Sequence, residues 1–256
     1  MLVYNENDGI TIEPRIVGQL DRVKYVRILM RKVLRHYKAK TTDGTIFLFR
    51  SEGQDMDTIR NVFVHDVYEL KSYVKKDDCI LDVGAHIGAF ALLSSKLVGD
   101  GGLVLSFEPS KSNFSLLSKN LSINKRSNVR ICNVAVGDVE GWSVLRIYNR
   151  HGGNSFYARN DLKMVGLERV RVTTVDNILM FNGIKKCDFA KIDVEGHELK
   201  VLEGMRKTLA KYHPRLHIET HFFGPNTDRI VSFLKEYDYH CEVKRKSMRF
   251  QLIFAV

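Results

Sequence analysis

The chain carries a dense group of ionisable side chains in the segment KIDVEGHE. The group consists of Asp193, Glu195, His197 and Glu198. Carboxylates and imidazoles of this kind can accept a proton from a reacting hydroxyl. Because histidine titrates nearest neutrality, we expect His197, or His221 in the later segment IETH, to be the proton acceptor, with Asp193 and Glu195 as the alternatives. For Glu198 we expect a structural role in the first turn of a helix, where the helix dipole favours a negative charge.

The same residue types could instead hold a divalent cation. Asp193, Glu219 and His221 offer the oxygen and nitrogen ligands that such ions take. Their spacing, however, matches no compact metal-binding motif. We therefore predict no metal site from the sequence.

A glycine-containing loop, DVGAHIG at residues 82–88, separates a predicted strand from a predicted helix. Gly84 and Gly88 permit positive φ and let a ligand approach the backbone closely. Glu108 ends the next predicted strand, 20 residues after Gly88. Doubly wound folds place there the carboxylate that accepts the ribose hydroxyls of an adenosine ligand. The loop and Glu108 together predict an adenosine-binding site.

The spacing of the glycines indicates which adenosine ligand is bound. A dinucleotide-binding loop has the pattern G-x-G-x-x-G, whose second glycine makes room for the pyrophosphate. His86 occupies that position here, which disfavours a nicotinamide dehydrogenase. A ligand without phosphate that carries an ammonium group and a sulfonium tolerates a side chain there, and it suits an acid such as Asp82 at the start of the loop. S-adenosylmethionine fits these requirements.

The elements that would position these residues follow from the pattern of apolar residues. From Lys76 onward, short apolar runs alternate with helical periodicity, which is typical of an α/β fold with a parallel sheet. The predicted strands are residues 79–83, 103–108, 129–136, 188–193 and 215–220. The predicted helices are residues 89–98, 111–123, 197–212 and 226–236, and a C-terminal hairpin is expected from Tyr239 onward.

Two further segments extend this framework. An insertion at about residues 141–178 contains two predicted strands, at 142–148 and 169–174. We expect its basic and aromatic residues to overhang the active site and to suit an anionic or sugar acceptor. These residues are Arg146, Tyr148, Arg150, His151, Phe156, Tyr157 and Arg159.

Residues 1–75 form a predicted N-terminal cap of helices and a β-hairpin. The hairpin is expected to turn at Asp43-Gly44. A helix is predicted over residues 57–73, and a basic amphipathic helix over residues 21–35.

The composition limits the classes of protein. Lys and Arg number 40 against 30 Asp and Glu, and the net charge of +10 favours acidic partners. The basic residues are spread along the chain, so nucleic acid is not the partner we favour. The four cysteines form no metal or redox motif, and we find neither a signal peptide nor an apolar run of about 18 residues. These features predict a cytoplasmic protein without a transmembrane segment, and a homo-oligomer is compatible with them.

Five segments resemble a known family when they are taken in order. DVGAHIGAF, FEPS, NVAVGD, TTVDNIL and KIDVEGHELKVLEG are similar to the FkbM family of S-adenosylmethionine-dependent methyltransferases, over about residues 57–220. The resemblance implies a Rossmann-like class I methyltransferase domain in residues 76–256, with a seven-stranded, mostly parallel sheet whose last strand is antiparallel. It also implies methyl transfer, generally to oxygen, with a hydroxyl of a small molecule or a glycan as acceptor.

The resemblance also implies a set of cofactor-binding residues. They are Asp82, Gly84, Ala85, His86, Gly88, Glu108, Pro109, Val136, Asp138 and Asp193. Within this set the glycine loop would face the methionine part of the cofactor, and Glu108 the ribose. Residues 135–138 would border the adenine, whose amino group would be accepted by Asp138 or by the main chain at Val136. Asp193 would lie beside the transferring methyl.

Two alternatives remain open at this point: an RNA methyltransferase, and a non-catalytic protein that binds an adenosine ligand. Against methylation of base amino groups, the fourth predicted strand runs into DVEG rather than into an Asn/Asp-Pro-Pro-aromatic segment that would stack a flipped base. A non-catalytic protein would tolerate alanine at Asp193, His197 and His221, whereas an enzyme would not.

Overall fold

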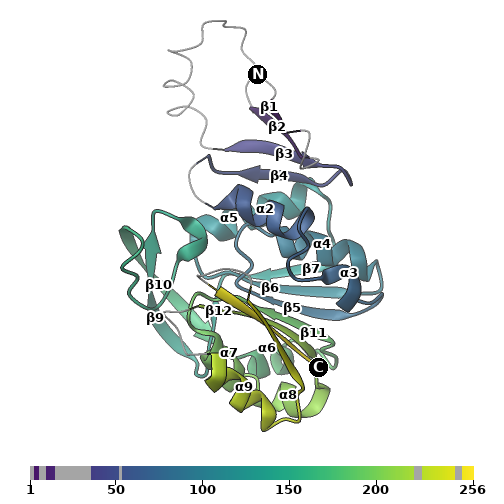
Figure 1. Cartoon of the computed structure of the whole chain (residues 1–256), viewed down its shortest axis with the longest axis vertical. Coiled ribbons are helices and arrows are strands. Elements are labelled where there is room, and N and C mark those ends of the chain that lie inside the picture. Colours follow the sequence, from purple (N-terminus) through teal and green to yellow (C-terminus); the bar gives the residue numbers. More distant parts are fainter. Residues whose placement is uncertain (1–2, 6–9, 15–35, 52–53, 222–226, 246–249) are drawn as a thin grey trace, which may run out of the picture.

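The computed structural model describes residues 3–5, 10–14, 36–51, 54–221, 227–245 and 250–256. At its centre lies a seven-stranded sheet with the order β13-β14-β12-β11-β5-β6-β7 (Figure 1). The mutually parallel strands are β5 (Cys79–Val83), β6 (Leu103–Phe107), β7 (Val129–Cys132), β11 (Phe189–Ile192) and β12 (Arg215–His221). β14 (Phe250–Ala255) runs antiparallel to β12, and β13 (Cys241–Arg245) pairs antiparallel with β14. The predicted seven-stranded, mostly parallel sheet with an antiparallel last strand is confirmed.

Helices cover both faces of this sheet, which explains why its central strands are apolar without alternation. One face carries α2 (Asp55–Phe63), α3 (Leu70–Tyr73), α4 (Ala89–Val98) and α5 (Lys111–Ile123). The other face carries α6 (Val175–Phe181), α7 (Glu198–Glu203), α8 (Arg206–Tyr212) and α9 (Thr227–Lys235). In β5, Ile80 belongs to the core under α4 and α5, while its neighbour Leu81 belongs to the core on the opposite face.

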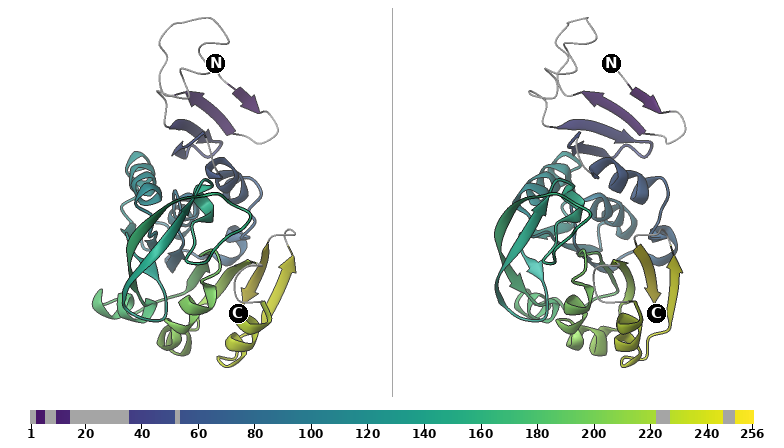
Figure 2. Two further views of the ribbon diagram at one scale, coloured as in Figure 1. Left: turned by 90° about the vertical axis from the view of Figure 1, so that its left-hand side faces the viewer. Right: turned by 60° about the vertical axis from the view of Figure 1, so that its left-hand side comes forward.

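The insertion forms a second, three-stranded sheet with the order β8-β10-β9. β9 (Gly141–Tyr148) and β10 (Met164–Thr173) are antiparallel and stand beside the main sheet (Figure 2). β8 (Ala135–Val136) pairs with β10, so the prediction of one strand over residues 129–136 is wrong. The chain leaves the main sheet at Asn133, whose side-chain amide donates to the carbonyl oxygens of Glu108 and Pro109 at 2.9 and 3.0 Å.

The cap contains an antiparallel sheet of β1 (Val3–Asn5), β2 (Ile10–Pro14), β3 (Tyr37–Thr41) and β4 (Ile46–Phe49). The predicted turn at Asp43-Gly44 is confirmed, with Gly44 at a φ of +85°. Strands β1 and β2 were not expected, and the predicted basic helix at 21–35 lies outside the described residues. The Asn120 side chain of α5 accepts from Leu48 N at 2.7 Å and donates to Leu48 O at 3.1 Å. The hairpin of the cap is therefore fixed to the helical layer of the main sheet.

Two predicted helices are divided in the structure. The helix expected over residues 57–73 is present as α2 and α3, separated by a segment in which Asp66 and Glu69 have left-handed φ values of 42° and 50°. The helix expected over residues 197–212 is present as α7 and α8, which separate at Gly204. A Cβ on Gly204 would lie 1.9 Å from Gly137 O, so the chain can pass β8 there only without a side chain. Helix α6 was not predicted.

Across the described residues we find no helix with the length and apolar character needed to span a membrane.

Candidate active site

A cavity of about 550 Å³ opens beyond the carboxyl ends of β5, β6, β11 and β12. Open α/β sheets bind their ligands at this edge. The lining comes from the glycine loop, from the residues that follow β6 and β11, from the insertion, and from α2 and Tyr68 of the cap. One space is therefore shared by segments that are far apart in the sequence.

Most of the sequence-predicted site residues line this cavity. Those that do are Gly84, Ala85, His86, Glu108, Pro109, Val136, Asp193, Glu195, His197 and His221. Asp82, Gly88 and Asp138 are not among the lining residues. Asp82 is fully buried in β5, Gly88 begins α4, and the Asp138 carboxylate accepts from Lys200 Nζ at 2.8 Å.

The glycine loop is shaped by close contact with its surroundings. Gly84 has a φ of +85°, and a Cβ on it would lie 1.8 Å from Asp193 O. Gly88 has a φ of +91°, and a Cβ on it would lie 2.6 Å from Leu117 Cδ1 of α5. A side chain at Gly84 would clash with the backbone of Asp193, and the positive φ favours glycine at both positions. The loop thereby lies directly between β11 and α5.

Glu108 is held in a fixed orientation at the cavity wall. Only 5% of the residue is exposed, yet it is part of the lining. Its Oε2 accepts from His86 N at 2.8 Å, and its Oε1 accepts from Ser110 N at 2.9 Å and from Asn113 Nδ2 at 3.3 Å. Because Oε2 receives a single hydrogen bond from these partners, it retains a lone pair for a hydroxyl donor. This geometry fits a carboxylate that accepts from a ribose diol.

A buried lysine connects the glycine loop to the floor of the cavity. Lys191 is 3% exposed, and its Nζ donates to Gly84 O at 2.7 Å. The ammonium lies 3.5 Å from Asp82 Oδ1 and 3.4 Å from Asp193 Oδ2. Burial alone would lower the pKa of Lys191, but Asp193, Asp82 and Glu219 outweigh it and raise that pKa. Lys191 is therefore charged and ties the base of the loop to Asp193.

The two histidines of the predicted site occupy different places. His197 lies beside the strand-end segment after β8, where a Cβ on Gly137 would be 3.1 Å from His197 Nε2. Its ring lies 4.8 Å from that of Phe156, centroid to centroid. Burial lowers the pKa of His197, so its imidazole is neutral at neutral pH. His197 thus lies beside residues 135–138, the segment that was expected to border the adenine.

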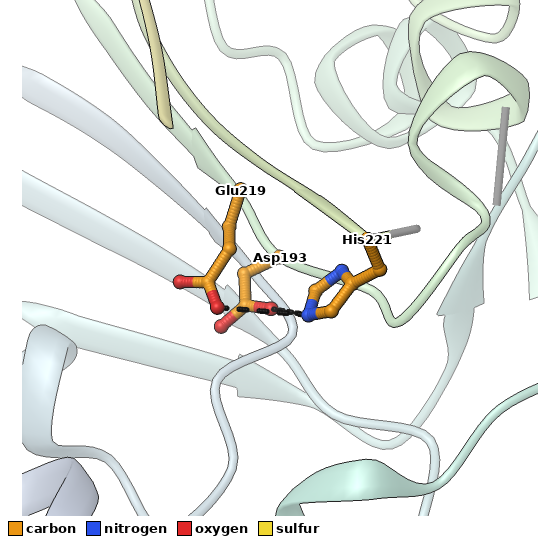
Figure 3. A group of neighbouring side chains, drawn as sticks. All are labelled: Asp193, Glu219 and His221. Atoms are coloured by element: carbon orange, nitrogen blue, oxygen red, sulfur yellow. Dashed lines mark ion pairs between the residues drawn. The ribbon is translucent and has the colours of Figure 1, made fainter. Parts of the chain in front are cut away.

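His221 lies instead within a group of carboxylates at the ends of β11 and β12. Its Nδ1 is 3.1 Å from Glu198 Oε1, and its Nε2 is 3.5 Å from Glu195 Oε2. The same Nε2 lies 3.5 Å from Glu219 Oε1 and 3.9 Å from Asp193 Oδ1 (Figure 3). Burial opposes the charge, but Glu195, Glu198 and Glu219 raise the pKa of His221 well above its usual value. In this arrangement the imidazole carries a proton and cannot accept another.

Glu195 is set apart from the other carboxylates by its partners in the insertion. Its side chain forms an ion pair with Arg159, and its carbonyl oxygen accepts from Ser155 Oγ at 2.6 Å. Burial raises the pKa of Glu195 to about 7, with His221 acting in the opposite direction. Glu195 can therefore exchange a proton near neutral pH at a position facing the cavity.

The insertion overhangs the cavity through some of the predicted residues only. His151, Phe156 and Arg159 line it, whereas Arg146, Tyr148, Arg150 and Tyr157 do not. Arg150 is exposed, and Tyr148 is buried with its hydroxyl donating to Tyr157 O at 3.2 Å.

Tyr68 and Lys191 have no functional role in the sequence analysis, and Glu198 has only a structural one. Tyr68 reaches the site from the cap, and its hydroxyl lies 2.9 Å from Glu219 Oε2 and 3.3 Å from Asp193 Oδ2. Lys191 was read only as part of an apolar strand. Glu198 lies in the first turn of α7 as expected, and in addition it is fully buried and contacts His221. For Lys191 and Glu198, a charged residue within an apolar pattern was the available signal, and Tyr68 gave none.

Comparison with known protein families identifies the domain. The family model described as the methyltransferase FkbM domain matches residues 82–241. This match begins at the glycine loop, includes the ends of β11 and β12, and stops within β13.

Relatives of known name are also methyltransferases. Methyltransferase 1 of Beauveria bassiana is 27% identical over 57% of this chain and 65% of its own length. The hexuronic acid methyltransferase AglP of Haloferax volcanii is 28% identical over 53% of each chain. The chain thus spans about half to two thirds of the length of these relatives.

A solved structure shares the fold. The FkbM methyltransferase from Methylobacillus flagellatus superposes with a TM-score of 0.50 at 20% identity, over 78% of this chain and 54% of the other.

Proposed function

The chain belongs to the FkbM methyltransferase family, and we propose that it transfers a methyl group from S-adenosylmethionine to a hydroxyl oxygen of a small molecule or glycan. The observation that carries this proposal is the shared cavity. The glycine loop and Glu108 line the part that we call the cofactor end, and Glu195, Glu219 and His221 line the part that we call the acceptor end. The two parts adjoin where Asp193 O lies against Gly84. A donor and an acceptor bound in these two parts would meet in one shared space.

The cofactor end fits S-adenosylmethionine in its chemistry and its size. The cavity volume of about 550 Å³ lies within the range of roughly 300 to 1,000 Å³ that is usual for small-molecule sites. Glu108 would accept from the ribose hydroxyls, and the main chain of Val136 with the ring of His197 would border the adenine. When bound, the sulfonium of S-adenosylmethionine supplies an electrophilic methyl group.

The residues at the other end would orient the acceptor and receive its proton. Asp193 and Glu219 face the cavity with carboxylate oxygens that can accept from a hydroxyl. Glu195 is the residue we assign as proton acceptor, because it lines the cavity and burial raises its pKa to about 7. Orientation supplies a large part of such a rate acceleration, and a general base adds about 10²- to 10⁴-fold.

We favour a sugar acid as the acceptor class. One relative of this chain is named for methylation of a hexuronic acid. In this chain the insertion brings Arg159 and His151 to the cavity, where their side chains suit an acidic sugar.

A labelled-methyl assay tests the proposal. The protein is incubated with S-adenosylmethionine labelled in its methyl group and with uronic-acid glycans, neutral glycans, small hydroxy compounds or RNA. Label is expected in the glycans, and it is expected to disappear in Glu195→Gln but not in the exposed control Arg150→Gln. Label in RNA alone would support the alternative of an RNA methyltransferase. Binding of S-adenosylmethionine without transfer to any acceptor would support a non-catalytic binding protein.

A further inference from the structure

The ends of β11 and β12 bring together side chains that metal ions use as ligands. Asp193, Glu219 and His221 each offer a ligand atom, and these atoms lie within 4.8 Å of one another (Figure 3). The residues come from strands that are parallel neighbours in the sheet, which is why 28 positions of sequence separate the first from the last. The sequence showed no compact motif because the sheet, rather than a local turn, assembles the group. We propose that these three residues bind a divalent cation at the acceptor end of the cavity.

The distances suit a cation at the centre of the group better than direct contacts between the side chains. His221 Nε2 lies 3.5 Å from Glu219 Oε1 and 3.9 Å from Asp193 Oδ1. Both distances exceed the upper limit of about 3.2 Å for an N–H···O hydrogen bond. Ligand atoms that each lie about 2.1 Å from one metal ion are separated from each other by about 3 to 4 Å. The two distances from His221 Nε2 therefore match the separation of ligand atoms around one ion.

Each of the three side chains is held through an atom that faces away from the centre. Tyr68 places its hydroxyl 2.9 Å from Glu219 Oε2 and 3.3 Å from Asp193 Oδ2. Lys191 Nζ lies 3.4 Å from the same Asp193 Oδ2. Glu198 holds His221 through Nδ1 at 3.1 Å. Such partners orient the ligands of metal sites and fix the histidine tautomer.

Glu198 is the second observation that points to a cation. It is fully buried, and its Oε2 has no hydrogen-bond partner within the part of the chain that the structure describes. A buried carboxylate that contacts a histidine strengthens the imidazole as a ligand. Without a cation, Nε2 of His221 would have a single N–H to donate, although it faces the carboxylates of Asp193, Glu195 and Glu219. A divalent cation that displaces the Nε2 proton would bind the neutral imidazole and balance these charges.

The mixture of ligands indicates the class of cation. Imidazole nitrogen suits transition metals such as Zn²⁺, whereas carboxylates also suit Mn²⁺ and Mg²⁺. One histidine with two carboxylates therefore favours Mn²⁺ or Zn²⁺ over Ca²⁺. Three protein ligands leave further positions for water or for an acceptor oxygen, and Asp193 and Glu219 both line the cavity.

The role we assign to this cation rests on the proposed function. A hydroxyl entering the acceptor end would face the cation, which lowers the pKa of a hydroxyl beside it. The proton would pass to Glu195, whose Oε2 lies 3.5 Å from the proposed ligand atom His221 Nε2. The oxygen would form a bond to the methyl carbon, and the bond from that carbon to sulfur would break to leave a neutral thioether. Metal binding itself does not require that this reaction takes place.

Titration of the full chain with Mn²⁺, after removal of metals with EDTA and dialysis, tests the site directly. Electron paramagnetic resonance reports the loss of the free Mn²⁺ signal as the ion binds. Saturable binding of one ion per chain is expected, with Ca²⁺ a weaker competitor than Zn²⁺. His221→Ala and Glu219→Gln should abolish it, and Tyr68→Phe should weaken it about 10- to 100-fold. Glu203→Gln is the matched control, because Glu203 lies outside the cavity and pairs with Lys200.

The outcomes separate the metal site from the proposed function. No saturable Mn²⁺ binding by the wild type, or equal binding by His221→Ala and the wild type, would overturn the site. Equal competition by Ca²⁺ and Zn²⁺ would contradict ligation by the imidazole. Calorimetry with S-adenosylmethionine on the metal-free protein shows that each variant is folded and tests the cofactor end independently. Methyl transfer that survives EDTA undiminished would refute the catalytic role of the ion while leaving the proposed function intact.

Discussion

The two ends of the cavity are built in different ways. At the cofactor end, the backbone does most of the shaping: two glycines with positive φ form the loop, and backbone amides of His86 and Ser110 orient Glu108. At the acceptor end, the site consists of charged side chains from β11, β12 and the cap, with Tyr68 lying 125 positions from Asp193 in the sequence. The first end can bind one particular molecule through a short local motif. The second consists of side chains that the whole fold brings together. Substitutions of these side chains could therefore adapt it to a different acceptor without changes of the backbone.

The largest effect should come from removing the proton acceptor at the acceptor end. Glu195→Gln keeps the shape of the side chain but cannot take up a proton. We expect kcat to fall about 10²- to 10⁴-fold while the affinity for S-adenosylmethionine stays the same, because the Glu195 side chain pairs with Arg159 and His221 and not with the residues that hold Glu108. Steady-state kinetics and calorimetry on the same preparation measure both quantities. A loss of cofactor affinity as large as the loss of kcat would show that the two ends are not separate.

The complementary change at the cofactor end is Glu108→Ala. It removes the carboxylate that lines the cavity and accepts from His86 N of the glycine loop. Hydrogen bonds to a charged group contribute about 1.5 to 3 kcal/mol, so the affinity for S-adenosylmethionine should fall about 10- to 100-fold. Calorimetry measures the change, and Glu140→Gln, which lies outside the cavity, is a suitable control. Unchanged affinity in Glu108→Ala would remove Glu108 from the cofactor site.

A buried ion pair joins the cap to the cofactor end and should make stability depend on pH. Asp55 of α2 lies 2.7 Å from Arg50 Nη2 and 3.0 Å from His86 Nε2 of the glycine loop. Burial raises the pKa of Asp55, but His86 and Arg50 outweigh it and lower that pKa below its usual range. A depressed carboxyl pKa stabilises the fold above the unfolded-state value of about 3.9, and this contribution is lost as the pH falls further.

Asp55→Asn should therefore lower the free energy of unfolding by about 1 to 2 kcal/mol near pH 7. Urea unfolding at a series of pH values measures the difference from the wild type. The difference should be constant above about pH 5 and should shrink at lower pH, where Asp55 of the wild type becomes protonated. A difference that grows as the pH falls would have the wrong sign for this ion pair.

The smallest effect is expected from substitutions of two arginines in the insertion, Arg159 and Arg150, which should differ in their effect on KM. Arg159→Gln removes a cation that lines the cavity and should raise KM for an acidic acceptor about 10-fold, the cost of one charged contact. Because Arg159 also pairs with Glu195 and lowers its pKa, the substitution should shift the pH dependence of kcat to higher pH as well. Arg150→Gln should leave KM unchanged, because Arg150 is exposed and lies outside the lining. Equal effects of the two substitutions would mean that the insertion acts through its overall charge.

The same contrast explains what the sequence could predict. The central strands β5 and β6 are mostly buried and consist largely of apolar residues, and the bounds of β5, α4 and α5 were predicted to the residue. The glycine loop and Glu108 are likewise local features. The pairing of β8 with β10 was missed because Asn133 turns the chain out of the main sheet by binding backbone carbonyls, which the apolar pattern does not reveal.

At the acceptor end, the sequence predicted individual residues but not the contacts between their side chains. Asp193, Glu195 and His221 were identified as ionisable residues after strands, and the structure places all three at the cavity. That Glu198 would hold His221, or that Tyr68 would reach Glu219, depends on how helix α7 and the cap pack on the sheet. Helix α6 was also missed, although Thr174 caps it by accepting from Asn177 N at 3.1 Å.

A crystal structure of the protein with S-adenosylhomocysteine tests the central claim most directly. We expect the adenosine in the cavity, with both ribose hydroxyls within hydrogen-bond distance of the Glu108 carboxylate and the sulfur directed toward Asp193. An adenosine bound elsewhere, or a ribose that makes no contact with Glu108, would contradict the assignment of the two ends of the cavity.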